Sequence, residues 1–203
     1  MSCASLNTLI RGLLACILLL AFTRADISAQ TKNEAQQTGR SQAMSEQSNP
    51  NLGKKFPEVT AASLAKNPES IPKSAQGKVT LVAVAFLRES QSQLDSWLGP
   101  FAEKFGNLEG FTFYEVPMIS SGYKFMRMII DGGMRAGLPE SKHKHVVTMY
   151  GDVEKYITEL QLDPRSGHAF LLDRQGIIRF QGQGFAKPET LKELFAAAEQ
   201  LAK

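Results

Sequence analysis

Cysteine is almost absent from this sequence of 203 residues, and its two copies, Cys3 and Cys16, both lie within the first sixteen positions. From residue 17 to residue 203, no side chain can become a thiolate or enter a disulfide. Thiol nucleophiles and cysteine-ligated zinc sites both require the thiolate. Composition alone therefore excludes both kinds of site from the rest of the chain.

A strong excess of either charge is also missing. The formal net charge is +3, and setting aside Arg11, Arg24 and Asp26 near the N-terminus leaves 21 basic against 19 acidic residues. A long nucleic-acid surface needs a concentrated basic face, so we expect no nucleic-acid partner. The length is sufficient for one domain with its own buried core.

No apolar run approaches the roughly 20 residues that a membrane-spanning helix needs. The longest near the N-terminus, Leu13–Phe22, follows Arg11 and has the character of a signal-peptide core, with small residues at Ala25 and Ala29 as possible cleavage points. The sequence predicts a signal peptide or an uncleaved signal anchor over residues 1–29. The protein is then exported and periplasmic or membrane-associated, and a mitochondrial inner-membrane location stays open as the alternative.

Apolar residues are scarce in the next segment, residues 30–51, which is rich in Gln, Ser and Asn. Such a composition cannot offset the entropy lost on ordering, so we predict a disordered linker. Residues 52–203 are expected to form a single folded domain. Its first part carries Gly53, Pro57, Pro68 and Pro72 and predicts an irregular lead-in.

Strand and helix patterns alternate from residue 79 onward. Val79–Phe86 is a continuous apolar run typical of a strand buried on both faces, and Ser90–Phe105 has apolar residues at helical spacing. The further predicted elements are a strand at Phe111–Val116 ended by Pro117, a helix at Tyr123–Met134, a strand at His145–Tyr150, a helix at Asp152–Leu160, a hairpin of Ala169–Leu172 and Ile177–Gln181, and a helix from Lys187 to Leu201.

This order combines parallel crossover units with a terminal antiparallel hairpin. It predicts an α/β fold, namely a thioredoxin-like three-layer α/β/α sandwich with a mixed central sheet and one insertion. A Rossmann unit is the alternative, but Leu87–Ser90 follows the first strong strand where a G-x-G-x-x-G motif would be required.

The position of the reactive thiol in thioredoxin-like enzymes lies between the central strand and the next helix. Here that junction contains Ser90 and Ser92, with no adjacent base to activate a hydroxyl. We expect both serines to cap the helix. The proline that precedes the hairpin in thioredoxins is missing as well, since Ser166–Ala169 occupies its place. We predict no catalytic and no cofactor-binding residue.

Histidines offer the one hint of a metal site. His143 and His145 would share a face of the predicted strand, yet Lys142 and Lys144 beside them disfavour a bound cation. We expect a solvated basic edge and no metal. His168, at the head of a core strand, is expected to bond to backbone.

Methionines and aromatics concentrate around the helix predicted at Tyr123–Met134. Met-rich faces suit adaptable binding to apolar partners, but the same stripe could be core, with Phe125, Ile129 and Ile130 buried. The candidate partner-binding residues are Trp97, Phe125, Met126, Met128 and Arg179. Asp173 and Arg179 are also expected to have a local role in the hairpin, where Asp173 can bond turn amides.

Four stretches of the chain resemble one known family. They are VTLVAVAF at residues 79–86, Ser96–Phe101, Arg135–Pro139 and the block GHAFLLDRQGIIRFQGQGFAKPE at residues 167–189. Over Val79–Leu194 the chain is similar to the thioredoxin-like assembly factors of the ATP synthase membrane sector, relatives of mitochondrial ATPase complex subunit ten.

The last block carries the most specific part of this resemblance. The family pattern is a glycine and an aromatic, then Leu-x-Asp, Ile-Arg, a second aromatic and Gly-x-Gly-x-Ala. The matching positions are Gly167, His168, Leu171, Asp173, Ile178, Arg179, Phe180, Gly182, Gly184 and Ala186. His168 departs from the usual aromatic, and Phe180 stands where tryptophan is common.

The resemblance implies a chaperone without a catalytic cysteine pair that helps a proton-channel subunit assemble in the inner membrane. We therefore expect a non-enzymatic, redox-inactive assembly factor or chaperone for the ATP synthase Fo sector, with a membrane subunit as its protein partner. The alternative is a degenerate enzyme of the redoxin superfamily, related to peroxiredoxins or thiol-disulfide oxidoreductases, which would need a thiol.

Overall fold

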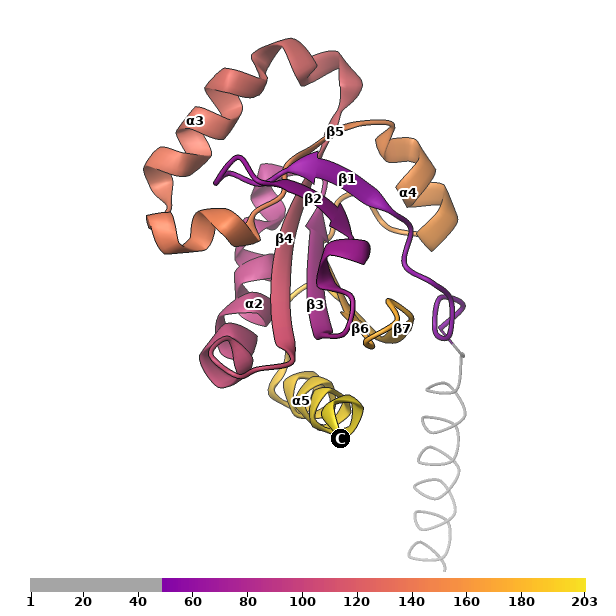
Figure 1. Cartoon of the computed structure of the whole chain (residues 1–203). Coiled ribbons are helices and arrows are strands. Elements are labelled where there is room, and N and C mark those ends of the chain that lie inside the picture. The colour runs from indigo at the N-terminus through magenta and orange to yellow at the C-terminus, as the bar shows by residue number, and fades with distance from the viewer. Residues whose placement is uncertain (1–48) are drawn as a thin grey trace, which may run out of the picture. The chain divides into compact units, whose positions relative to one another are not determined.

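The computed structural model describes residues 49–203 (Figure 1). The leader predicted at residues 1–29, and the predicted linker as far as residue 48, lie outside these described residues. Asn51, the last residue of the predicted linker, belongs instead to the folded part. Its buried side-chain amide donates to the backbone oxygen of Leu160 at 2.7 Å and to Oε1 of Gln181 at 2.9 Å.

A five-stranded sheet in the order β5-β4-β3-β6-β7 forms the centre of the fold. β3 (Val79–Ala85) runs parallel to β4 (Phe111–Ser120) and antiparallel to β6 (His168–Leu172). At the edges, β5 (Met149–Gly151) is parallel to β4 and β7 (Ile178–Gln183) is antiparallel to β6. All seven residues of β3 are buried, as its unbroken apolar sequence predicted. The predicted mixed sheet is confirmed.

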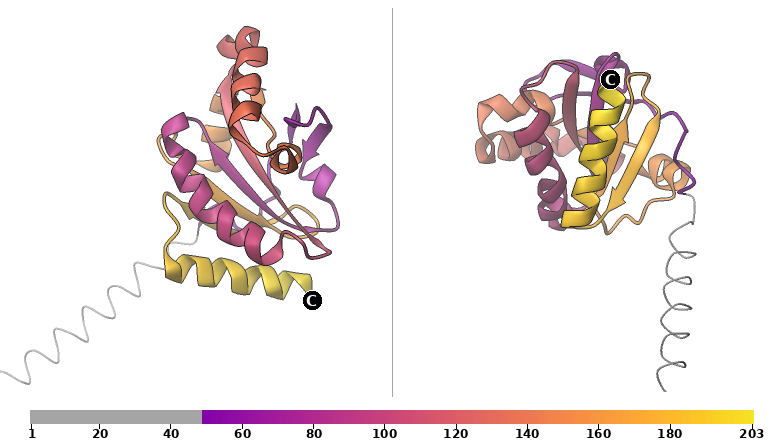
Figure 2. Two further views of the ribbon diagram at one scale, coloured as in Figure 1. Left: turned by 90° about the vertical axis from the view of Figure 1, so that its left-hand side faces the viewer. Right: turned by 90° about the horizontal axis from the view of Figure 1, so that it is seen from below.

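Two layers cover the sheet. α2 (Gln91–Phe105) and α5 (Pro188–Ala202) lie on one face (Figure 2), where Leu94, Phe101 and Leu194 pack on the sheet. On the other face are α4 (Val153–Leu160) and the hairpin of β1 (Val59–Ala62) and β2 (Pro68–Ile71). The three-layer arrangement is therefore the one predicted, and the two apolar clusters on either side of β3 explain its complete burial.

Two predictions for the chain up to the end of β4 need correction. The lead-in is not irregular throughout, because it contains the β1–β2 hairpin, whose four-residue strands are too short to show a clear alternation. β4 does not stop at Pro117 but continues to Ser120. Pro117 is the last partner of β3, opposite Ala85, and pairing with β5 starts at Met118, so the proline lies where the strand changes neighbours.

The segment after β4 departs most from its prediction. It forms the 3-10 helix η3 (Ser121–Met126), α3 (Arg127–Gly137) and a second 3-10 helix, η4 (Glu140–His145). The alternative in which this stripe is core, with Phe125 and Ile129 buried, is wrong, because both side chains are exposed and Asp131 is the one buried residue of α3. α3 lies beyond the sheet edge formed by β5 (Figure 1), and a pocket lined by residues of both β4 and α3 separates its apolar side chains from the sheet.

The hairpin of β6 and β7 forms as predicted, with Gly176 in its turn at a φ of +81°. Asp173 holds this turn together. Its buried carboxylate accepts hydrogen bonds from the backbone N–H groups of Gln175 and Ile177, both at 2.9 Å, and from Nε of Arg179 at 2.7 Å. The expected bonds from Asp173 to turn amides are confirmed.

These contacts predict an acid-sensitive contribution to stability. Burial alone would raise the pKa of Asp173, but the bonds from Ile177, Arg179 and Gln175 outweigh it and lower the pKa. The unfolded state therefore takes up a proton first, so this stabilisation is complete above about pH 3.9 and lost as the pH falls toward the lower folded value. Asp173→Asn should cost about 1–3 kcal/mol near neutral pH and reduce the acid dependence of the free energy of unfolding.

Denaturant titrations between about pH 5 and pH 2 measure this effect. Glu109→Gln, at an exposed position in the turn before β4, is the control. An Asp173→Asn protein with the same acid dependence as the control would contradict the prediction.

Candidate functional site

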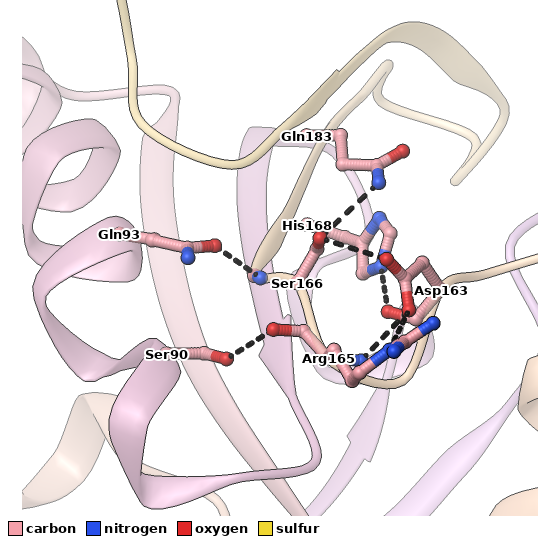
Figure 3. Close-up of polar contacts among 8 residues, drawn as sticks. Ser90, Gln93, Asp163, Arg165, Ser166, His168 and Gln183 are labelled. Atoms are coloured by element: carbon pink, nitrogen blue, oxygen red, sulfur yellow. Dashed lines mark hydrogen bonds and ion pairs between the residues drawn. The ribbon is translucent and has the colours of Figure 1, made fainter.

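The junction between β3 and α2 is the place where a thioredoxin-like enzyme would keep its thiol, and here it is tied to the loop before β6 (Figure 3). Ser90 is buried, and its hydroxyl donates to the backbone oxygen of Arg165 at 3.1 Å. Oε1 of Gln93 accepts the backbone N–H of Gly167 at 2.7 Å. Ser90 makes no capping bond to the helix, so the predicted capping role of its side chain is wrong.

The loop before β6 is internally bonded as well (Figure 3). The carboxylate of Asp163 accepts the Arg165 N–H at 3.0 Å and the Ser166 hydroxyl at 3.2 Å, and Nε2 of Gln183 donates to the same hydroxyl oxygen at 3.2 Å. Nucleophilic catalysis needs a hydroxyl or thiol bonded to a base. The Ser90 hydroxyl at this junction donates to a backbone carbonyl and not to a base. The contacts of Ser90 and Gln93 therefore hold the loop before β6 against the start of α2.

His168, the first residue of β6, also contacts this loop. Nε2 lies 2.9 Å from the backbone oxygen of Asp163, which confirms the predicted backbone bond, and a carbonyl partner requires the proton to be on Nε2. Nδ1 is buried without a hydrogen-bond partner among the described residues. Burial lowers the pKa of His168, against the opposing effect of Asp163.

This arrangement predicts a second pH effect. Because the folded pKa lies below the unfolded value of about 6.5, the unfolded state binds the proton first and stability is lost as the pH falls below that value. His168→Phe should flatten the decline between about pH 7 and pH 5 by up to about 1.4 kcal/mol per pH unit. Thermal or denaturant unfolding across this range is the measurement, and an unchanged slope would contradict it.

Two of the predicted partner-binding residues, Trp97 and Arg179, make contacts within the domain. Trp97 is 1% exposed, its Nε1 donates to the backbone oxygen of Gly184 at 2.7 Å, and its ring packs edge-on against Phe180. Arg179 contacts Asp173 through both Nε and a terminal nitrogen at 2.7 Å. Trp97 is therefore buried in this structure, and Arg179 is paired within the hairpin while its side chain stays 47% exposed.

The other three predicted residues lie together on η3 and α3. Phe125 is 85% exposed and Met128 86%, while Met126 between them is partly buried. Ile129, at 71%, and Tyr123, at 56%, extend the same region. We call Tyr123, Phe125, Met128 and Ile129 the α3 patch. Large exposed apolar side chains that gather in one segment of a folded domain make that segment a candidate surface for another molecule.

A pocket of about 720 Å³ lies between α3 and the start of α2. Its apolar lining includes Phe86, Leu87, Ile129, Ile130, Met134 and Leu138. Gly133 and Gly137 line the α3 side, and a Cβ added at either would meet no atom within 4 Å, so this wall is open. Sequence reasoning missed Leu87 and Leu138. The one signal for Leu87 is that a large apolar residue directly follows the predicted central strand, at the junction where thioredoxin-like enzymes keep the reactive thiol.

The two histidines of the candidate metal site do not share a strand face. The strand predicted at His145–Tyr150 is reduced to β5, and both histidines lie in η4. Nε2 of His143 lies 3.2 Å from the backbone oxygen of Arg135 and 3.1 Å from that of Leu138. The His145 ring stacks on Phe113. Within residues 49–203, no three His, Cys, Asp or Glu side chains are grouped to hold a metal ion.

Comparison with known proteins identifies the family. The sequence model of the family described as ATP10 protein matches residues 42–201. This chain belongs to the ATP10 protein family. The predicted resemblance is thereby confirmed, and membership in this family of ATP synthase assembly factors supports an assembly role with a protein partner. Among curated proteins, none matches the sequence.

Solved structures agree on the fold of this ATP10 family member. BsSco, a member of the Sco family of cytochrome c oxidase assembly proteins, aligns with a TM-score of 0.53 at 10% identity over 77% of this chain and 98% of its own. The thioredoxin domain of a thiol-disulfide oxidoreductase from Bacteroides vulgatus aligns with a TM-score of 0.50 at 19% identity over 75% and 98%. The thioredoxin-like fold is confirmed. Over residues 49–203, no helix has the length and apolar character to cross a bilayer.

Proposed function

We propose that this chain is a redox-inactive, non-enzymatic assembly factor that holds an apolar segment of an ATP synthase Fo membrane subunit beside α3. Family membership supports the assembly role. The α3 patch supports the proposed position of the client segment. It consists of four large apolar side chains, each more than half exposed, next to an apolar pocket. Burying one such side chain contributes about 1.5–3 kcal/mol.

The α3 region suits a client that must later be released. Met128 and Met134 have flexible, polarisable side chains that adapt to different apolar partners. α3 itself buries little more than Asp131, whose carboxylate accepts the Tyr150 hydroxyl at 2.8 Å, so the helix can adjust without disrupting the main core. An adaptable surface on a rigid sheet is the arrangement we expect of a transient chaperone.

Capture from cells tests the assembly role. Crosslinking of the full-length chain in native cells, followed by mass spectrometry, should recover Fo membrane subunits. N-terminal sequencing of the recovered chain tests the compartment, which we propose is reached through residues 1–29 by export or, alternatively, by import to the mitochondrial inner membrane. Recovery of envelope proteins without any ATP synthase subunit would contradict the proposed client.

Redox inactivity is tested by insulin reduction and by peroxide turnover. We expect no turnover from the full-length chain, and none from a chain in which Cys3 and Cys16 are replaced by serine, because residues 17–203 contain no thiol. Thioredoxin provides the positive control in the insulin assay. Turnover by the double-serine chain would contradict the proposal and favour the degenerate redoxin enzyme.

A further inference from the structure

Glu115 is a carboxylate placed inside the apolar pocket beside α3. It lies on β4 opposite Ala83 of β3, and its neighbours Tyr114 and Val116 point into the core on the other face of the sheet. Alternation along the strand therefore turns Glu115 toward the α2 side, where it lines the pocket. No role in the fold as described accounts for a carboxylate at this position.

The carboxylate of Glu115 has no ionic partner among the described residues, since the ion pairs of residues 49–203 all involve other groups. Burial raises the pKa of Glu115, and the nearby carboxylate of Asp95 raises it further. The Gln91 amide and Lys142 act in the opposite direction. Lys142 is exposed and outside the pocket lining, so the group within the lining that favours the charged form of Glu115 is the neutral amide of Gln91.

Negative charge exceeds positive charge in the lining of the pocket. Asp95 lines it together with Glu115, and one of its oxygens accepts the side-chain amide of Gln91 at 3.2 Å. Arg88 is the one cationic side chain of the lining and is exposed. An apolar segment that entered the pocket would remove water from Glu115, and a desolvated carboxylate is costly unless a cation pairs with it.

We propose that this pocket selects an apolar client segment that carries a single lysine or arginine, whose cation pairs with Glu115. The inference rests on the proposed function and names the chemistry of the client. An apolar segment without a cation leaves Glu115 unpaired and binds more weakly. A segment with an acidic residue at that position brings two carboxylates together and binds worst.

Binding of synthetic peptides to the full-length chain in neutral detergent micelles tests this selection. The probes are dye-labelled Leu and Ala helices of about 20 residues, identical except for a central Lys, Met or Glu. Fluorescence anisotropy should show that the Lys peptide binds about tenfold or more tighter than the Met peptide, and the Glu peptide weakest. Glu115→Gln should remove the preference while keeping or improving binding of the Met peptide, and the exposed Glu109→Gln should change neither.

The outcomes separate this inference from the proposed function. Equal binding of the Lys and Met peptides would overturn the charge selection while leaving the apolar pocket as the client site. A Lys preference that survives Glu115→Gln and disappears in Asp95→Asn would overturn the assignment to Glu115. Absence of binding by all three peptides would overturn the proposed function and the inference together.

Discussion

Replacing Ile129 with glutamate is expected to reduce capture of the Fo membrane subunit by about tenfold or more. Ile129 is 71% exposed and lines the pocket, so the new charge would lie where the apolar client segment has to pack. A loss of about 1.4 kcal/mol or more in binding free energy corresponds to this factor. Quantitative mass spectrometry of crosslinked material from cells that express equal amounts of each variant is the measurement.

Leu108→Glu is the matched control for this substitution. Leu108 is 52% exposed, lies in the turn between α2 and β4, and does not line the pocket. Because both side chains are exposed, Ile129→Glu and Leu108→Glu should each leave the free energy of unfolding within about 0.5 kcal/mol of the wild-type value. Equal capture by the two variants would contradict the assignment of the client site to the α3 patch.

Replacing Trp97 with alanine is expected to destabilise the domain by about 3–5 kcal/mol. The indole is almost fully buried, its N–H donates to Gly184, and it lies so close to Gly182 that a Cβ added there would be 2.5 Å from the ring. The substitution leaves a large cavity under α2 and an unpaired carbonyl. Equilibrium denaturation with urea measures the change in the free energy of unfolding.

Trp97→Phe separates packing from the hydrogen bond, because it keeps an aromatic ring and removes the donor. It should lose less stability than the alanine variant, and both variants should capture client in proportion to the folded protein that remains. Reduced capture by a fully folded Trp97→Phe protein would instead support the original prediction that Trp97 contacts the partner.

Local patterns were sufficient for the elements with strong periodicity. The apolar run of β3, the helical spacing in α2 and α5, the helix α4 that follows Asp152 and the glycine turn before β7 all form as predicted. Each depends on the backbone preferences of neighbouring residues, which the sequence displays directly. The thioredoxin-like topology follows from their order.

The errors arose where a pattern allowed two environments. An apolar stripe on a helix predicts that one side will be covered, but it does not state what covers it. For α3 the stripe could have been core, yet the helix lies beyond the β5 edge and presents its carboxylate Asp131 to Tyr150. Trp97 is the reverse case, since a residue predicted to contact a partner is almost fully buried in the core.

The sequence by itself determined the fold class, the family and the absence of thiol chemistry after residue 16, because these depend on residue types and their order along the chain. Only the tertiary structure decided which apolar side chains remain exposed, that Ser90 bonds to Arg165, and that Glu115 lies in a pocket bordered by α3. Ser90 and Arg165 are 75 positions apart. Contacts over such separations are set by packing of whole elements, which composition and periodicity do not encode locally.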